Sequence, residues 1–374
     1  MLFFRTRFPM LAAAAKNVLI FAACAAAVWY CFRLIAFSNE VQTAVRLSVT
    51  RCAAVIIPSL FAFMAVSELI VRTGLYAYLA LPLYPFYRYV LGMDRAVFFA
   101  FVVGNVSGYP VGIRTLANFV SAQTLTREQA EKAACFCYAG GPAFAAGAVG
   151  GAVFGDPRIG TLLFLSSLCA NTATAFLFGL RGRKQRFSGT SGQRPQFQCA
   201  AQDVIASAEN AGRALFMICV LIVLFAAVLA VAESTGIFTL AATHFGWSSN
   251  VLRCVRAFFE ISFVSGLTGA PYGLLPLISC TLAFGGLCVM LQIVAVNRKL
   301  FSLRLFFLTR PLNIALNLLF LRIFWARFVP DALAANAAPP VVLVNHTSTA
   351  PSVCLIFMII LLLLKKRLVF QKNM

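Results

Sequence analysis

Charged residues are scarce in this sequence of 374 amino acids. Only 11% of them are Asp, Glu, Lys or Arg, whereas a soluble domain carries about a quarter. Hydrophobic residues make up 61% of the chain and fall into a series of long apolar runs. A run of about 20 such residues is long enough to cross the hydrocarbon core of a bilayer. The composition therefore excludes a soluble globular domain and predicts an all-α, polytopic membrane protein surrounded by the lipid bilayer.

Histidines are even scarcer, with only His244 and His346, both in expected loops. Most of the twelve cysteines lie inside apolar runs, where cysteine behaves as a small hydrophobe. No second pair accompanies Cys135 and Cys137 at zinc-ligand spacing, and no Ser or Cys has a plausible histidine partner for nucleophilic catalysis. We therefore expect no metal site, no cofactor and no enzymatic activity.

The basic residues give a net charge of +20, which could suggest a nucleic-acid partner. They lie instead in short clusters between apolar runs, at 5–16, 181–194, 298–304 and 365–372, with no nucleic-acid-binding motif. Such clusters mark cytoplasmic loops and contact anionic lipid head groups. The segments 233–250 and 328–351 lack Lys and Arg and are expected on the outer side. Nucleic acid is thus not an expected partner, and the C-terminus is expected in the cytoplasm.

The apolar runs and basic clusters divide the chain into five expected regions. These are an N-terminal anchor helix and outer loop (1–50), a first membrane unit (51–180), a basic cytoplasmic linker (181–202), a second membrane unit (203–326), and an outer loop with a C-terminal transmembrane helix (327–374). A cleaved signal peptide is the alternative for the first run, but Lys16 interrupts its early part. In the first unit, an aromatic-rich segment at 75–91 favours the membrane interface.

The stretch Gly-Asn-Val-Ser-Gly-Tyr-Pro-Val-Gly at 104–112 interrupts an apolar run. Three glycines and a proline in nine residues cannot continue an ordinary helix. Secondary transporters place their substrate sites at such broken helices, whereas a kink packed on small residues is the alternative. A second break is expected at Gly140-Gly141-Pro142, after a helix that begins at a capping box of Thr126 and Gln129 and runs to Tyr138.

The same order of landmarks occurs twice along the chain. An apolar span that closes on Glu68 is followed by Thr-Gly and by a run broken by Val-Ser-Gly at 106–108. A span that closes on Glu233 is likewise followed by Thr-Gly and by Val-Ser-Gly at 264–266. The charge clusters orient the two units oppositely, which is typical of inverted-repeat transport folds with broken or re-entrant helices. Chance similarity in a chain rich in Gly, Ala and Leu is the alternative.

Several further short motifs stand out along the two units. They are IPSLF at 57–61, SGYPVG at 107–112, GPAF at 141–144 with GAVG at 147–150, FEI at 259–261 and FGGLCVMLQ at 284–292. These motifs resemble those of the YlbJ-type sporulation integral membrane proteins, and the resemblance spans roughly residues 51–324. It implies a multi-pass protein of the bacterial cytoplasmic membrane, linked to endospore formation, with nucleoside-recognition (Gate) units and no defined substrate. This chain has Cys-Tyr-Ala-Gly at 137–140, where the family has Asn-rich residues before Gly-Pro, and the difference puts the ligand in question.

The candidate substrate-binding residues lie at the breaks and in the spans expected to face them. They are Asn105, Ser107, Gly108, Tyr109, Pro110, Gly141, Pro142, Ser265, Gly266 and Gln292. Glu260 and Asn171 are candidates for binding a coupling cation. A carboxylate inside a span costs ~2.5–3.5 kcal/mol on insertion scales, so it is expected to face protein or water.

The polar residues in or beside the spans could have a structural role instead of a role in binding. Glu260 could pair with Arg253 or Arg256, one or two helical turns away. Asn171 and Gln292 could instead bond between helices. Arg114 could hold an anionic group or extend toward the interface. Glu68 and Glu233, at the ends of spans, are expected to be interfacial caps.

Two classes of function stay open. One is a permease for a small polar solute, nucleoside-like by the resemblance, coupled to a cation and working by alternating exposure of a site between the two units. The other is a non-transporting membrane component of spore formation that holds a partner or a lipid precursor. A homo-oligomer is compatible with either class.

Overall fold

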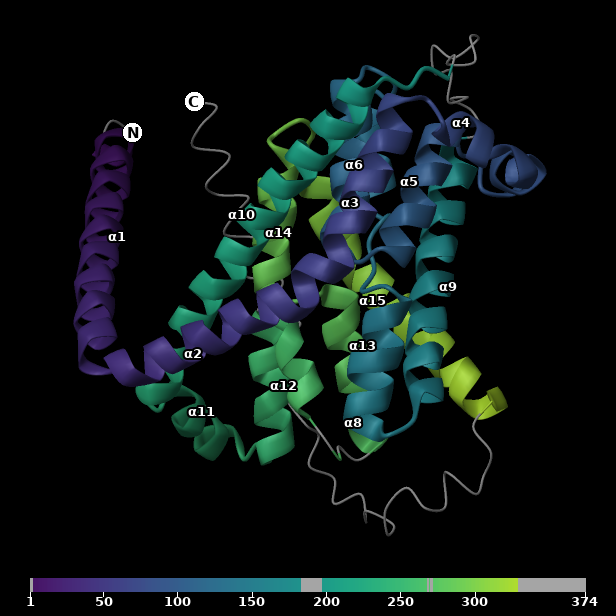
Figure 1. Ribbon diagram of the computed structural model, residues 1–374. Coiled ribbons are helices and arrows are strands. Elements are labelled where there is room, and N and C mark those ends of the chain that lie inside the picture. The colour runs from purple at the N-terminus through teal and green to yellow at the C-terminus, as the bar shows by residue number, and fades with distance from the viewer. Residues whose placement is uncertain (1–2, 183–196, 268, 270–271, 329–374) are drawn as a thin grey trace.

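The computed structural model describes residues 3–182, 197–267, 269 and 272–328, and every regular element within these ranges is a helix (Figure 1). Five helices there are long and apolar enough to cross a membrane: Asn17–Ala36, Pro157–Gly179, Ala201–Ser234, Tyr272–Asn297 and Arg304–Phe328. The prediction of an all-α polytopic membrane fold is confirmed. Residues 183–196 of the expected linker, and the expected C-terminal membrane helix within 329–374, lie outside the described residues.

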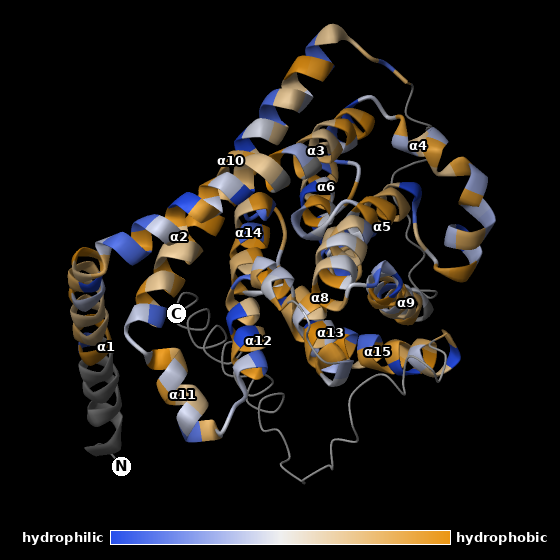
Figure 2. Ribbon diagram, turned by 60° about the horizontal axis from the view of Figure 1, so that its bottom comes forward, coloured by the Kyte–Doolittle hydropathy of each residue, from blue (hydrophilic) through white to orange (hydrophobic). Residues whose placement is uncertain are grey.

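The N-terminal helix α1 (Phe3–Ala36) stands apart from the other helices (Figure 1). None of its 18-residue apolar window is buried in the protein, as expected for an anchor whose neighbour is lipid. Residues 38–50, expected as an outer loop, are helical instead. They form α2 (Ser38–Arg51), which packs along α10 (Ala201–Ser234) and carries more hydrophilic positions than the other helices near it (Figure 2).

The first membrane unit begins with a π-helical turn, η1 (Cys52–Ile56), and α3 (Ile57–Arg72). The chain then bends by 97° between the helical stretches Leu60–Arg72 and Tyr76–Leu83. The bend leads into the short helices α4 (Tyr76–Leu79), η2 (Leu81–Leu83) and η3 (Phe86–Val90). Their exposed tyrosines agree with an interfacial segment.

The helices α5 (Arg95–Val106) and α6 (Tyr109–Ser121) form a hairpin. Gly108, with φ of 104°, makes the turn between them. A Cβ atom added to Gly104 would lie 3.0 Å from the Cα atom of Gly112 on the facing helix. Gly108 therefore allows the chain to reverse, and Gly104 and Gly112 allow the two short helices to cross closely. The stretch is a turn between two helices rather than a kink within a single helix.

The next span is interrupted. It consists of α7 (Arg127–Ala134), an irregular segment at 135–141, and the helical segments η4 (Phe144–Gly151) and α8 (Ala152–Phe154). The long helix α9 (Pro157–Gly182) returns beside η4, where Gly150 and Gly160 permit close backbone contact. The predicted capping box of Thr126 and Gln129 is confirmed.

The prediction that the helix after this capping box runs to Tyr138 was wrong, because α7 ends at Ala134. The carbonyl groups that follow are taken by side chains from other helices. Asn105 donates to the carbonyl oxygen of Phe136 at 3.3 Å, and Asn171 donates to that of Tyr138 at 2.9 Å. Arg310 donates to the carbonyl oxygen of Cys135. The unwound backbone thus finds its partners inside the protein, which a membrane environment demands.

The second membrane unit is built from a further series of helices. After α10 come α11 (Ile237–Phe245) and α12 (Ser249–Phe259), and the chain reverses at Glu260 into η5 (Ile261–Gly266). An interrupted span follows, made of η6 (Tyr272–Leu274) with α13 (Leu275–Phe284) and of α14 (Leu287–Asn297). The long helix α15 (Arg304–Phe328) completes the unit. Glu260 was expected inside a span; instead, it has extended φ and ψ angles that end α12.

Candidate functional site at the helix breaks

The interruptions of the two units meet inside the protein. The hydroxyl of Tyr109, at the start of α6, donates to the carbonyl oxygen of Leu282 at 2.8 Å. The hydroxyl of Tyr138, in the irregular segment of the first unit, donates to the carbonyl oxygen of Phe284 at 2.7 Å. Both acceptors belong to the last turn of α13, whose carbonyl groups have no partner within the helix. Two tyrosines of the first unit therefore cap the broken helix of the second.

The glycines at these breaks leave space for the tyrosines. Gly285, with φ of 88°, stands where an added Cβ would overlap the Tyr138 hydroxyl, and a Cβ on Gly140 would lie 2.7 Å from the Tyr109 hydroxyl. The two tyrosine rings lie side by side, with centroids 5.0 Å apart. A Cβ on Gly286 would lie 3.2 Å from the backbone nitrogen of Ile261. The turn after Glu260 therefore packs against the break at Gly285-Gly286.

A ladder of buried amides crosses the site. Asn171, on α9, donates to the side-chain oxygen of Asn105 at 2.7 Å, and Asn313, on α15, donates to that of Asn171 at 2.8 Å. These three side chains are at most 2% exposed, so each bond forms away from water. The ladder joins the hairpin α5–α6 to the long helices of both units. The interpretation of Asn171 as a hydrogen-bonding link between helices agrees with this geometry.

Arg310 is a buried cation on α15, only 1% exposed. Its guanidinium lies over the rings of Tyr138 and Phe306, 5.0 and 4.4 Å from their centroids. Among the described residues no carboxylate lies within ion-pair distance of it, and its Nε and Nη1 atoms have no hydrogen-bond partner. Arg310 lies about 9 Å from the start of α15, since a helix rises 1.5 Å per residue. The sequence patterns do not identify Arg310 as a candidate site residue.

Glu260 is 4% exposed and lies where the chain reverses between α12 and η5. It accepts hydrogen bonds from the backbone nitrogen of Ser262 at 3.1 Å and from the hydroxyl of the same residue. Arg51 donates to that hydroxyl at 2.6 Å and lies 4.0 Å from the carboxylate. The alternative that Glu260 pairs with Arg253 or Arg256 was wrong, because its ion-pair partner is Arg51 and Arg256 pairs with Glu233 at 3.1 Å.

The structure brings together most, but not all, of the expected site residues. Asn105, Ser107, Gly108, Tyr109, Pro110 and Gly141 are buried at the first break, with Pro142 half-buried beside them. Gln292 is buried on α14 and donates to Cys288, one turn away on the same helix. Ser265 is half-buried and Gly266 is exposed, and both lie in η5. In the second unit, the break at the centre is Gly285-Gly286 rather than Val264-Ser265-Gly266.

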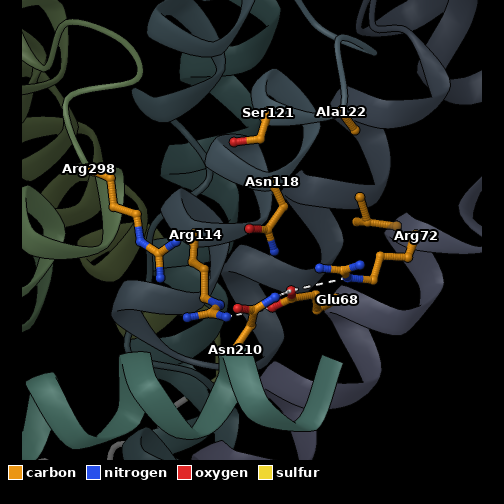
Figure 3. A pocket seen from close by; sticks show the side chains of 9 residues that line it. Glu68, Arg72, Arg114, Asn118, Ser121, Ala122, Asn210 and Arg298 are labelled. Carbon is orange, nitrogen blue, oxygen red and sulfur yellow. Dashed lines mark hydrogen bonds and ion pairs between the residues drawn. The ribbon is translucent and has the colours of Figure 1, made fainter. Parts of the chain in front are cut away.

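Glu68, on α3, and Arg114, on α6, form a second polar site (Figure 3). Their side chains are each 5% exposed and meet at 2.5 Å. The expectation that Glu68 is an interfacial cap was wrong, because α6 brings Arg114 against it inside the protein. Asn210 and Arg72 also donate to Glu68, at 2.8 and 3.4 Å.

Comparison with known proteins gives one informative similarity. The chain is 30% identical over 131 residues to the sporulation integral membrane protein YlbJ of Bacillus subtilis (strain 168). The match covers 35% of this chain and 32% of that relative. No family model matches the chain, and no solved structure matches it. The similarity supports the resemblance drawn from the sequence motifs, whereas the nucleoside-recognition (Gate) units stay a prediction.

Proposed function

We propose that this protein is a permease for a small polar solute, which binds where the helix breaks of the two units meet. The observation that carries the proposal is the capping of α13 by Tyr109 and Tyr138 from the other unit. In known secondary transporters, broken helices at the interface of two repeats form the substrate site. The order of hairpin, interrupted span and long helix in both units supports an inverted repeat.

Arg310 is the group best suited to hold the solute. It offers two nitrogen atoms without a hydrogen-bond partner, Nε and Nη1, which are buried beside aromatic rings. A solute with acceptor oxygens would satisfy them, and a flat ring, such as that of a nucleobase, would pack on Tyr138. Leaving such donors unpaired in a buried site costs about 1–3 kcal/mol each, which a bound solute would recover. The Asn105–Asn171–Asn313 ladder would hold the surrounding helices in position.

Glu260 is proposed to bind the coupling cation or proton. It is the buried carboxylate nearest a break, and Arg51 lies 4.0 Å from it rather than in a close ion pair. A bound cation would have to replace Arg51 or the Ser262 hydroxyl beside this carboxylate. Because Arg51 is the last residue of α2, such a change would be transmitted to α2 and η1.

Ligand-dependent thermal stability of the purified protein tests the solute site. Nucleosides, nucleobases, amino sugars and cell-wall precursors would be screened, with sodium and pH varied. A solute at ~100 times its dissociation constant adds about 2.7 kcal/mol to the free energy of unfolding. Substitutions Ser107→Ala and Arg310→Met are expected to abolish the shift. Absence of any shift under every ion condition would contradict the proposal.

A non-transporting role in spore formation is the second candidate. The printed name of the YlbJ relative supports a membrane protein of sporulation, and the helix breaks are largely satisfied by internal hydrogen bonds, as architecture alone would require. Capture of one protein partner, with no solute transported, would favour this role.

A further inference from the structure

A cavity of about 310 Å³ lies where α3, α6 and α10 meet the residue that follows α14 (Figure 3). It is separate from the helix breaks and is lined by charged and amide side chains: Glu68, Arg72, Arg114, Asn118, Asn210 and Arg298. Arg298 belongs to the basic cluster at 298–304, which is expected on the cytoplasmic side.

The cavity has an excess of positive charge. Three guanidinium groups, from Arg72, Arg114 and Arg298, line it together with the single carboxylate of Glu68. The net formal charge of these four side chains is thus +2. Both oxygens of Glu68 are already occupied, one by Arg114 and the other by Arg72 and Asn210. The carboxylate therefore has little capacity to neutralise the third arginine.

Two of these arginines have unused donors. The Nε atom of Arg114 is buried and has no hydrogen-bond partner, although the rest of the side chain is fixed by Glu68. In the part of the chain that the structure describes, no carboxylate lies within ion-pair distance of Arg298. Arg298 has φ of 48° and Lys299 has φ of 59°, a region that non-glycine residues seldom adopt. The side chain of Arg298 extends toward Arg114 (Figure 3).

We propose that this cavity binds a phosphate-type anion. A phosphomonoester carries about −1.5 to −2 charges at neutral pH, which matches the excess of +2. The oxygens of a phosphate can accept hydrogen bonds from donors on different sides. In this cavity the donors are the guanidinium groups of Arg114 and Arg298 and the side-chain amide of Asn118. Arginine is well suited to such oxygens because its N–H groups form a rigid fork. The phosphate could belong to a lipid head group or to a soluble phosphorylated compound.

Thermal unfolding of the full chain in neutral detergent, with inorganic phosphate as the probe, tests the site. Chloride at equal ionic strength is the reference, and succinate is the comparison anion. A saturable stabilisation by phosphate is expected, with weaker or no stabilisation by succinate. Arg298→Gln should lower the apparent affinity for phosphate roughly tenfold or more, the effect of losing one charge-assisted hydrogen bond. Because Arg298 is exposed and has no ion-pair partner, this variant is expected to fold.

Arg304→Gln is the matched control, since it removes an exposed arginine of the same basic cluster that does not line the cavity. It should leave the phosphate response unchanged. A second arm compares nanodiscs of phosphatidylcholine alone with nanodiscs that also contain phosphatidic acid. A shift with phosphatidic acid that Arg298→Gln removes assigns the site to a lipid, and a shift with free phosphate alone assigns it to a soluble compound.

Three results would overturn the proposal: no saturable shift in either arm, an equal shift with succinate, or an unchanged response in Arg298→Gln. The proposal is independent of the permease function, because Arg310→Met should leave the phosphate response intact.

Discussion

The Tyr138 hydroxyl donates a 2.7 Å hydrogen bond to the carbonyl oxygen of Phe284, 146 residues away in the sequence. The donor lies in the irregular segment of the first unit, and the acceptor is the last residue of α13 in the second. This bond joins two interruptions that would each be costly alone in a membrane. The breaks of the two units are therefore one structural feature rather than two.

Replacing Tyr138 with Phe tests this link. The change removes the hydroxyl and leaves the Phe284 carbonyl buried without its partner, which should lower the free energy of unfolding by about 1–3 kcal/mol. Tyr78→Phe is the control, because Tyr78 is 43% exposed. Thermal unfolding in detergent measures both. Equal stability of the two variants would show that the bond contributes nothing.

Gly285→Ala should be among the most disruptive single changes in the second unit. The added Cβ would overlap the Tyr138 hydroxyl, and the residue has φ of 88°. Left-handed backbone and overpacking together predict a loss of at least about 2 kcal/mol. Gly212→Ala, in the middle of α10 with nothing within 4 Å of the added atom, should change stability by less than about 1 kcal/mol. A Gly285→Ala protein that unfolds at the wild-type temperature would contradict the described break.

Asn171→Ala should weaken the amide ladder from both sides. It removes the donor to Asn105 and Tyr138 and the acceptor for Asn313, and a loss of about 1–3 kcal/mol is expected. A double-mutant cycle with Asn105→Ala isolates the direct bond, for which membrane proteins average about 0.6 kcal/mol. Strictly additive effects of the two substitutions would mean that the two amides do not interact.

Arg310→Met should separate function from stability. The variant removes a buried cation without a carboxylate partner, and burying such a charge is costly. It also removes the donor to the carbonyl oxygen of Cys135, which costs about 1–3 kcal/mol. We expect these two effects to offset in part and the fold to be retained, while solute-dependent stabilisation is lost. Arg322→Met, an exposed position on the same helix, should preserve both. Severe unfolding of Arg310→Met alone would instead assign Arg310 a structural role.

The sequence predicted the fold class and the helix breaks of the first unit, because composition and Gly-Pro clusters act locally. It identified Asn105 and Tyr109 as residues of the first break for the same reason, and Asn171 as a polar residue inside a span. In the second unit it placed the break at 264–266, whereas the central break lies at Gly285-Gly286. It missed Arg310 and the pairing of Glu68 with Arg114, since both depend on contacts between segments far apart in the chain. The end of α7 was misplaced because side chains of other helices, such as Asn171, hold the carbonyl groups after Ala134.

Transport by proteoliposomes tests the central claim most directly. Vesicles that contain the wild-type protein would be incubated with a mixture of nucleosides, nucleobases, amino sugars and cell-wall precursors. Mass spectrometry would then identify what has entered. The account predicts that one class of solute accumulates above the level in protein-free vesicles, and that Tyr109→Phe and Arg310→Met reduce this uptake while Arg322→Met does not. Identical solute content in wild-type and protein-free vesicles, at every pH and sodium concentration, would contradict it.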